Sequence, residues 1–403
     1  MTGKEVGMGE WRNSTWGEEI SLEYGKALRD YNTGGGKYRV YGSNGPIGWT
    51  AHPLAKGPGV ILGRKGAYRG IQYSNDPFFV IDTAYYVVPK KDDLDLRWLY
   101  YAMQYHKLGE IDDGSPIPST TRSAVYAQEM QVPTLPEQKR IAHILGTLDD
   151  KIELNRRMNA TLETMARALF KSWFVDFDPV RAKMDGRKPE GMDAETAALF
   201  PSAFQESPLG PIPKGWTAGK VSEAFNLIMG QSPPGETYNE NEDGLPFYQG
   251  RTDFGFRYPT RRIYCTEPTR LAKEGDTLVS VRAPVGDINM ADEKCCIGRG
   301  VAAIRHKTGA TSFTYHTMAS LALDFARFEA EGTVFGSINK QNFENLAIIV
   351  PTAEIIAAYE SQAASLDNQV RINDRQSRTL TSLRDALLPK LLSGDFVSTE
   401  IPL

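Results

Sequence analysis

Basic side chains alternate with aromatic ones in two separate stretches of the sequence, a combination that suits contact with nucleic acid. The first stretch, between Tyr31 and Asn75, has six basic residues and no acidic ones, and tyrosines and a tryptophan are interleaved with them. Lysine and arginine bind phosphate groups, arginine can pair with the edge of a guanine, and asparagine or glutamine with that of an adenine. The stretch therefore predicts a surface that contacts DNA.

A second stretch of the same kind lies between Gly250 and Cys265. It holds four arginines against a single acidic residue, Asp253, and four aromatic residues are interleaved. A solvated charged face is the alternative interpretation for either stretch taken alone. Two such stretches in duplicated parts of one chain favour the interpretation as DNA contacts.

Thirteen residues in and near these stretches are candidates for DNA contact. Arg64 and Arg282 each follow an apolar run and are separated by 218 residues, so we expect them at equivalent strand ends. A structural ion pair is the alternative role for each arginine. The candidates are Lys37, Arg39, Tyr41, Ser43, Asn44, Arg64 and Lys65 in the first part of the chain, and Gln249, Arg251, Arg257, Arg261, Arg262 and Arg282 in the second.

Motifs of catalysis are incomplete in this sequence. The run Gly34-Gly35-Gly36-Lys37 lacks the earlier glycine and the following serine or threonine of a phosphate-binding loop. The run Asn75-Asp76-Pro77-Phe78 lacks the second proline of the amino-methyltransferase motif, and the five histidines are scattered without metal-ligand spacing. We therefore expect no catalytic residue, no metal site and no cofactor in this chain.

Size and composition exclude several other classes of protein. A chain of 403 residues exceeds one typical domain, so two or three units are expected. The formal net charge of −4 argues against a generic basic DNA-coating protein. The sequence has no apolar run of about 18 residues and no apolar signal-peptide core, and its three cysteines suit a reducing compartment. We expect a cytoplasmic protein without a membrane span.

An internal repeat organises the chain. The segment 132–169 aligns without gaps to 350–387, and eleven of the 38 residue pairs are identical. A single repeat with so long a period indicates a duplicated unit, in which a globular part is followed by a long helix.

Within the repeated segment, apolar residues recur at two positions of a seven-residue period. This spacing places them on one face of a helix, as in a coiled coil. Asn155 and Asn373 fall at the same position of this seam, where a buried asparagine can fix the register. Packing of each helix on its own domain is the alternative. The predicted helix-pairing residues are Leu148, Ile152, Asn155, Leu162, Leu366, Val370, Asn373 and Leu380.

Short apolar runs upstream of each helix predict strands, notably at 60–62, 79–81, 277–281 and 301–304. The expected fold is α+β: two mixed α/β domains separated by two long antiparallel coiled-coil helices, related by a pseudo-two-fold internal repeat. The proline-rich stretch between the copies predicts a linker. The expected segments are a first globular domain at 1–135, a first helix at 136–178, the linker at 179–212, a second globular domain at 213–352 and a second helix at 353–403.

Five short sequence motifs lie along the chain, at Ile20 to Lys26, Tyr41 to Gly45, Pro133 to Gln138, Gly210 to Trp216 and Leu383 to Gly394. In this order and with the duplication, they give the chain from about Glu10 to Ser398 a family likeness. The chain resembles the DNA-specificity subunits of type I restriction-modification systems. Ala353 to Ile356 depart from the Leu-Pro-Glu-Gln that this family places before the helix, so the resemblance leaves the start of the second helix open.

The resemblance implies a role and a set of partners. Each globular domain would be a target recognition domain that reads one half of a bipartite site in double-stranded DNA. The helices would set the distance between the halves and dock two methyltransferase subunits, and restriction motor-nuclease subunits would join the complex. Adenine methylation and DNA cleavage would be carried out by these partners, with S-adenosylmethionine, ATP and magnesium bound outside this chain.

Two other classes of protein fit the sequence less well. A fused restriction-modification enzyme needs a methyltransferase domain, and two recognition units already occupy the 403 residues. A helical scaffold without a DNA role does not account for the basic and aromatic stretches. Salt-dependent binding to a random pool of duplexes would distinguish such a scaffold from a DNA-binding protein.

Overall fold

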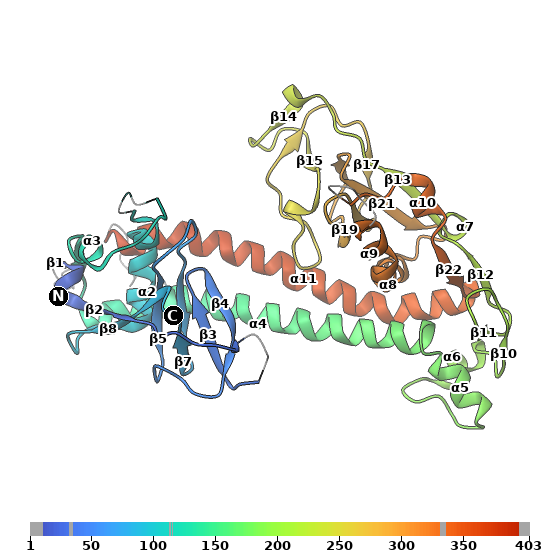
Figure 1. The fold of residues 1–403 in the computed structure, drawn as a ribbon, viewed down its shortest axis with the longest axis horizontal. Coiled ribbons are helices and arrows are strands. Elements are labelled where there is room, and N and C mark those ends of the chain that lie inside the picture. Colours follow the sequence, from blue (N-terminus) through green and yellow to red (C-terminus); the bar gives the residue numbers. More distant parts are fainter. Residues whose placement is uncertain (1–10, 32–34, 113, 115, 331–335, 395–403) are drawn as a thin grey trace, which may run out of the picture. The chain divides into compact units, whose positions relative to one another are not determined.

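The computed structural model describes residues 11–31, 35–112, 114, 116–330 and 336–394 (Figure 1). The chain divides into two compact units. The first unit combines the chain up to Leu154 with the part from Gln376 onward, and the second is Asn155–Arg375. Two 40-residue helices, α4 (Leu135–Phe174) and α11 (Ala353–Leu392), therefore each contribute one part to each unit.

The first unit is built around a four-stranded antiparallel sheet with the strand order β2-β8-β5-β6. The strand β5 has the apolar sequence GVILG, and all five of its residues are buried, as expected for an inner strand. Its strands and helices are β1 (Arg12–Thr15), α1 (Trp16–Glu19), β2 (Ile20–Tyr24), β3 (Tyr38–Gly42), β4 (Gly45–Thr50), β5 (Gly59–Gly63), β6 (Ile71–Ser74), β7 (Phe78–Val80), β8 (Ala84–Pro89), α2 (Leu96–Tyr105), α3 (Arg122–Tyr126) and β9 (Glu129–Val132).

Two smaller sheets complete the globular part of the first unit. In one, β3 pairs with β4 as a hairpin and with β7 in parallel; in the other, β1 pairs with β9. Helix α2 starts at an N-cap formed by Asp95, whose carboxylate accepts a hydrogen bond from the backbone N–H of Trp98. This helix buries Trp98, Leu99 and Met103 in the core next to β5, together with Leu145 of α4.

The second unit repeats this architecture. Its four-stranded sheet has the order β13-β21-β18-β19, and β12 pairs with β22 as β1 does with β9. The predicted strands at 277–281 and 301–304 are confirmed as β18 and β21. The elements that frame its core are β12 (Thr217–Lys220), α7 (Val221–Ala224), β13 (Phe225–Met229), β18 (Thr277–Val281), β19 (Val285–Met290), β21 (Val301–His306), α8 (Thr311–Ser320), α9 (Ala322–Ala330), α10 (Lys340–Glu344) and β22 (Ala347–Val350).

A further sheet of the second unit takes the place of the β3-β4-β7 sheet. Its strand order is β14-β16-β15-β20-β17, and β15 pairs with β20 in parallel, as β3 does with β7. Two additional strands form a separate small sheet. The bounds are β14 (Tyr238–Asn239), β15 (Leu245–Tyr248), β16 (Tyr264–Cys265), β17 (Leu271–Ala272) and β20 (Cys295–Ile297), with β10 (Phe204–Gln205) and β11 (Ile212–Pro213) in the small sheet.

The segment predicted as a linker, 179–212, contains two short helices, α5 (Asp178–Met184) and α6 (Ala194–Leu199). Val180, Phe200 and Ile212 are buried in the core of the second unit. The prolines therefore interrupt a folded segment that covers one end of this core.

The two long helices run antiparallel. In the second unit, contacts further along α4 are made to residues that come earlier in α11: Asn159 bonds Val370, and Phe170 packs edge-to-face against Tyr359. In the first unit, Asp149 accepts a hydrogen bond of 2.7 Å from Arg384. None of the predicted seam residues is exposed. Helix α11 begins at Ala353, the residue equivalent to the start of α4.

The asparagines of the seam form a buried hydrogen-bonded cluster. The Asn373 amide donates to Oδ1 of Asn159 at 2.9 Å, and the Asn155 amide donates to the backbone carbonyl of Asn373 at 3.3 Å. All three side chains are buried. The parts of each helix also contribute to the core of the unit that they join, so packing between the helices and packing on the domains occur together.

Candidate nucleic-acid interface

The first candidates lie on the β3–β4 hairpin of the first unit. Arg39 of β3 faces Trp49 of β4 as a cross-strand pair, with its guanidinium carbon 4.6 Å from the indole centroid. The Trp49 side chain is 41% exposed, and Lys37 is exposed beside Tyr38. Such a stack holds the guanidinium in place while leaving its donors accessible. The hairpin therefore presents an ordered cation and an aromatic surface.

The turn that follows β3 brings further candidates to the end of β5. The Ser43 hydroxyl donates to the Thr83 carbonyl at 2.7 Å and accepts from the backbone N–H of Lys65 at 3.4 Å. Ser43 is thereby used within the fold, whereas Asn44 and Lys65 are exposed beside it. Tyr41 packs edge-on against Phe78 and is half-buried. Of this group, Asn44 and Lys65 are best placed to contact DNA.

Arg64 is engaged within the first unit. Its guanidinium donates to the Asp82 carbonyl at 2.9 Å and lies 5.0 Å from the centroid of Tyr24 and 5.9 Å from that of Tyr85. Arg122, which was not among the candidates, lies 4.1 Å from the centroid of the same Tyr24 ring. Two arginines therefore share one tyrosine, which is 46% exposed.

The sheet register corrects the predicted equivalence of Arg64 and Arg282. In the first unit, one residue of β8 pairs with the last residue of β2 on one side and with Leu62 of β5 on the other. In the second unit, the equivalent residue of β21 pairs with the last residue of β13 on one side and with Val279 of β18 on the other. The sequence distance between equivalent residues of the two units is one residue shorter in this strand than in the long helices. Lys65 is therefore the counterpart of Arg282. The bridges Lys65–Ser119 and Arg282–Ser337 agree with this register.

The candidates of the second unit follow β15 and β18. Gln249 and Arg282 are exposed at the ends of these two strands. Their strand ends are adjacent, because Gly300 donates to the Gln249 carbonyl and accepts from the Val281 N–H. Arg251 lies close by and is bonded to Asp287 at 2.6 Å. This group corresponds to Asn44 and Lys65 of the first unit.

The remaining arginines of the second stretch are paired with carboxylates. Arg261 lies 2.6 Å from Glu293, and Arg262 lies 2.8 Å from Asp253; both arginines stay exposed. The pair of Arg261 with Glu293 is exposed on both sides, and such pairs are weak and can open toward a phosphate, whereas Asp253 is buried. Arg261 and Arg262 are therefore ion-paired in the structure.

The prediction that Arg257 contacts DNA is wrong. Its side chain has no exposed surface, lies 3.8 Å from the ring centroid of Tyr315, and bonds Glu163 of α4 and Asp367 of α11 at the same time. A buried arginine needs such partners because an unpaired buried charge is strongly unfavourable. Its sequence neighbourhood is that of the exposed arginines, so composition could not distinguish it.

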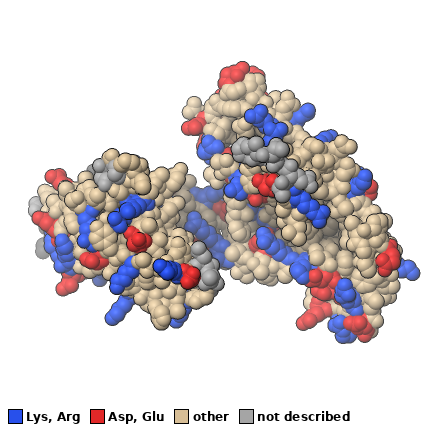
Figure 2. Space-filling view, in the orientation of Figure 1, with Lys and Arg blue, Asp and Glu red and all other residues tan. Residues whose placement is uncertain are grey.

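Basic and acidic side chains are intermixed on the surface. In the view of Figure 2, lysine and arginine side chains are dispersed over both units, with acidic side chains among them. The candidate residues thus form small basic groups, which a net charge of −4 allows.

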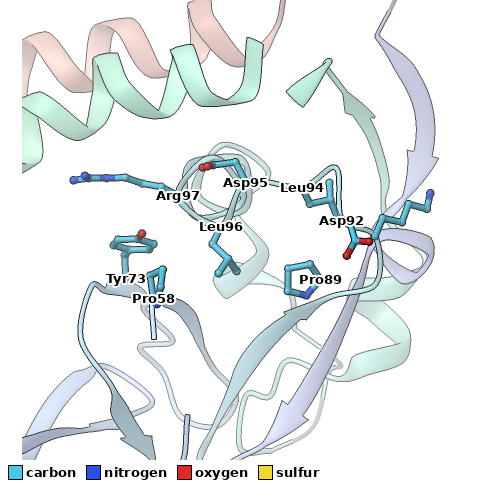
Figure 3. A pocket seen from close by; sticks show the side chains of 9 residues that line it. Pro58, Tyr73, Pro89, Asp92, Leu94, Asp95, Leu96 and Arg97 are labelled. Carbon is cyan, nitrogen blue, oxygen red and sulfur yellow. The ribbon is translucent and has the colours of Figure 1, made fainter. Parts of the chain in front are cut away.

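An open pocket of about 480 Å³ in the first unit lies beside α2 (Figure 3). Arg97 lines it, stacks on Tyr73 with 5.5 Å to the ring centroid, and bonds both carboxylate oxygens of Asp150 at 2.6 and 2.9 Å. Its lining includes no residue predicted to contact DNA. Arg97 thus ties α2 to α4, and the pocket lies apart from the candidate interface.

Neither a metal-binding cluster nor a membrane-spanning helix occurs in the part of the chain that the structure describes. No group of three or more histidine, cysteine, aspartate or glutamate side chains gathers there in a way that could hold a metal ion. No helix among the described residues combines the length and apolar character that crossing a membrane requires.

Comparison with known proteins finds relatives over nearly all of the chain. The family model "Type I restriction modification DNA specificity domain" matches residues 11–164 and again 213–382. A protein of Methanocaldococcus jannaschii described as the specificity subunit of the type I restriction enzyme MjaX is 28% identical over 315 residues, which cover 76% of this chain and 69% of that protein. The specificity subunit of the type I restriction enzyme HindI from Haemophilus influenzae is 26% identical over 396 residues, covering 82% and 84%.

A solved structure shares the fold. The S subunit of a type I restriction-modification system from M. genitalium superposes with a TM-score of 0.64 at 17% identity, and the alignment covers 97% of this chain and 98% of that one.

Proposed function

Because the chain belongs to the type I restriction-modification DNA specificity family and is a DNA specificity subunit, we propose that its two globular domains read the two halves of a bipartite DNA site. The observation that carries this proposal is the repeated topology. In each unit, the residues that follow a strand in parallel pairing lie near the end of an inner strand of the four-stranded sheet. This places Asn44 beside Lys65 in the first unit and Gln249 beside Arg282 in the second.

Recognition would combine two kinds of contact. Asn44 and Gln249 are exposed amides, which can pair with an adenine edge in the major groove, and Arg39 and Arg251 can pair with a guanine. The basic groups beside them would hold the backbone of the duplex and set the register. Because the side chains that follow β3 and β15 differ, the two domains would read different base sequences.

The long helices would set the gap between the two halves of the site. A helix of 40 residues is about 60 Å long at 1.5 Å per residue, which exceeds one turn of the DNA helix. The buried asparagine cluster would keep the two helices in a single register, and with it the gap.

Catalysis is assigned to partner subunits in the cytoplasm. The chain would dock two methyltransferase subunits, which supply S-adenosylmethionine, and restriction motor-nuclease subunits, which use ATP and magnesium. Its own contribution is to place a chosen adenine of each half-site within reach of the methyltransferase.

Mapping of methylated adenines tests this function. The full chain is combined with its methyltransferase subunit and S-adenosylmethionine, and a plasmid library of random sequence serves as substrate. We expect methylation in a motif of two short blocks separated by a fixed run of unspecified bases. A single uninterrupted motif would contradict reading by two domains. The chain without its partner should transfer no methyl group.

A further inference from the structure

Two basic side chains recur around one β-bridge in both units. In the first unit, Lys65 bridges Ser119, and Arg122 follows three residues after that serine. In the second unit, Arg282 bridges Ser337, and Lys340 follows at the same interval. We call Lys65 with Arg122, and Arg282 with Lys340, the basic pairs.

The local structure fixes the second member of each pair in the same way. Arg122 and Lys340 are the first residues of α3 and α10. Thr121 caps α3 by accepting from the Ala124 N–H, and Asn339 caps α10 by accepting from the Asn342 N–H. Such caps hold the residue that follows them in one backbone position. The second basic residue therefore recurs at the same structural position as well as at the same sequence interval.

The first member of each basic pair has no ion-pair partner among the described residues, and the second has only a partly exposed one. Lys65 and Arg282 are exposed, and neither forms an ion pair with any residue that the structure describes. Arg122 lies on Tyr24 with Glu23 at 3.9 Å, and Lys340 lies 3.5 Å from Glu344, with 59% of its side chain exposed. Pairs this open contribute little and leave the cation available to another anion.

The basic pairs recur in both units, whereas the side chains beside them differ, and this contrast indicates the ligand of the pairs. The side chains beside the pairs differ between the units: Asn44 follows β3, whereas Gln249 and Arg251 follow β15. Two domains that read different bases share one requirement, which is to hold the same sugar–phosphate backbone. Groups that are alike in both units suit that shared task, and groups that differ suit base reading.

We propose that the basic pairs are equivalent phosphate-binding sites that seat each domain on the DNA backbone, independently of base sequence. This proposal rests on the proposed function, because it names which residues of that interface bind phosphate. Arg64 has no basic counterpart, since Val281 occupies its place and is buried. Arg64 is accordingly excluded from the shared sites.

The test uses the full chain with its methyltransferase subunit and a fluorescent duplex carrying the mapped site. The double variants Lys65→Ala/Arg122→Ala and Arg282→Ala/Lys340→Ala are compared with Lys107→Ala and Lys214→Ala, which change exposed lysines outside the interface. Each double variant should bind more weakly and lower the slope of log affinity against log salt by about one unit per lost contact. The methylated motif should stay the same, and the control variants should bind as the wild type does.

Three outcomes would overturn the proposal. One is an unchanged salt slope in both double variants. Another is a changed base preference in one half-site, which would make the pair a base reader. A third is equal weakening by the charge-preserving swaps Lys65→Arg and Arg282→Lys, which would indicate a structural role. If the wild-type complex binds no duplex and methylates no bipartite motif, the proposed function fails instead.

Discussion

Asp149 of α4 and Asp367 of α11 stand at the same position of the two repeats, and each accepts a hydrogen bond from an arginine. The arginines have different origins. Arg384 lies on α11 itself, whereas Arg257 comes from the loop between η4 (Arg251–Asp253) and β16. In the second unit, a residue of the globular domain thus replaces a residue of the helix. The loop with the exposed arginines is thereby fastened to both long helices.

Removing Arg257 should strongly destabilise the second unit. The variant Arg257→Met leaves Asp367 buried without its cation and leaves Glu163 with the exposed Arg167 alone, which costs about 3–5 kcal/mol. The matched control is Arg251→Met, whose pair with Asp287 is exposed and should contribute less than about 1 kcal/mol. Urea unfolding followed by tryptophan fluorescence measures both. Equal stability of the two variants would show that the buried pair is unimportant.

The seam of the long helices could be predicted because burial follows one period over 40 residues. Every seventh residue returns to the same face of the helix, so the period identifies seam positions such as Leu148 and Ile152. The strands of the two sheets were also predictable where the apolar run was continuous, as in β5 and β18.

The interface was harder to predict because it depends on sheet register and on packing between distant segments. A change of one residue in loop length made Lys65, and not Arg64, the counterpart of Arg282. Burial of Arg257 depends on Glu163 and Asp367, which lie far from it in the sequence. Arg122 could have been found by extending the repeat upstream, since it aligns with Lys340 at the same offset as the helices.

The two exposed amides at the strand ends should each affect one half-site. Asn44→Ala should cost about 1–3 kcal/mol of discrimination at one base position of the first half-site, and Gln249→Ala should do so in the second. Ser43→Ala is the neighbouring control, because its hydroxyl bonds Thr83 inside the fold. Competition binding with single-base variants of the mapped site measures the effect. A loss that is uniform over all base positions would make these residues backbone contacts.

Acid should weaken the first unit through Glu19. Burial alone would raise the pKa of this carboxyl, but hydrogen bonds from Arg12, Lys91 and Ser14 outweigh it and lower the pKa to about 2. In the unfolded chain the carboxyl titrates at about 4.3. The ionised group therefore stabilises the fold above about pH 4.3, and this contribution is lost as the pH falls toward 2.

The variant Glu19→Gln isolates this effect. It should be less stable than the wild type at about pH 7, and the difference should narrow as the pH falls from about 5 toward 2. Melting temperatures of both proteins across this range measure the difference. A gap that stays constant down to about pH 2.5 would show that Glu19 is protonated in the fold or unimportant to it.

Lengthening both helices by one seven-residue period should widen the gap of the DNA site. Insertion after Leu154 in α4 and after Asn373 in α11 keeps the seam in phase, and it leaves the cluster of Asn155, Asn159 and Asn373 intact. Seven residues add about 10 Å at 1.5 Å per residue, or about three base pairs at 3.4 Å each. The sequences of both half-sites should stay the same, because the strand ends that read them are unchanged. Methylation mapping with the partner subunit measures gap and half-sites together, and insertion of four residues into α4 alone serves as the out-of-phase control. A gap that stays constant in a folded, active double insertion would refute the role of the helices as a spacer.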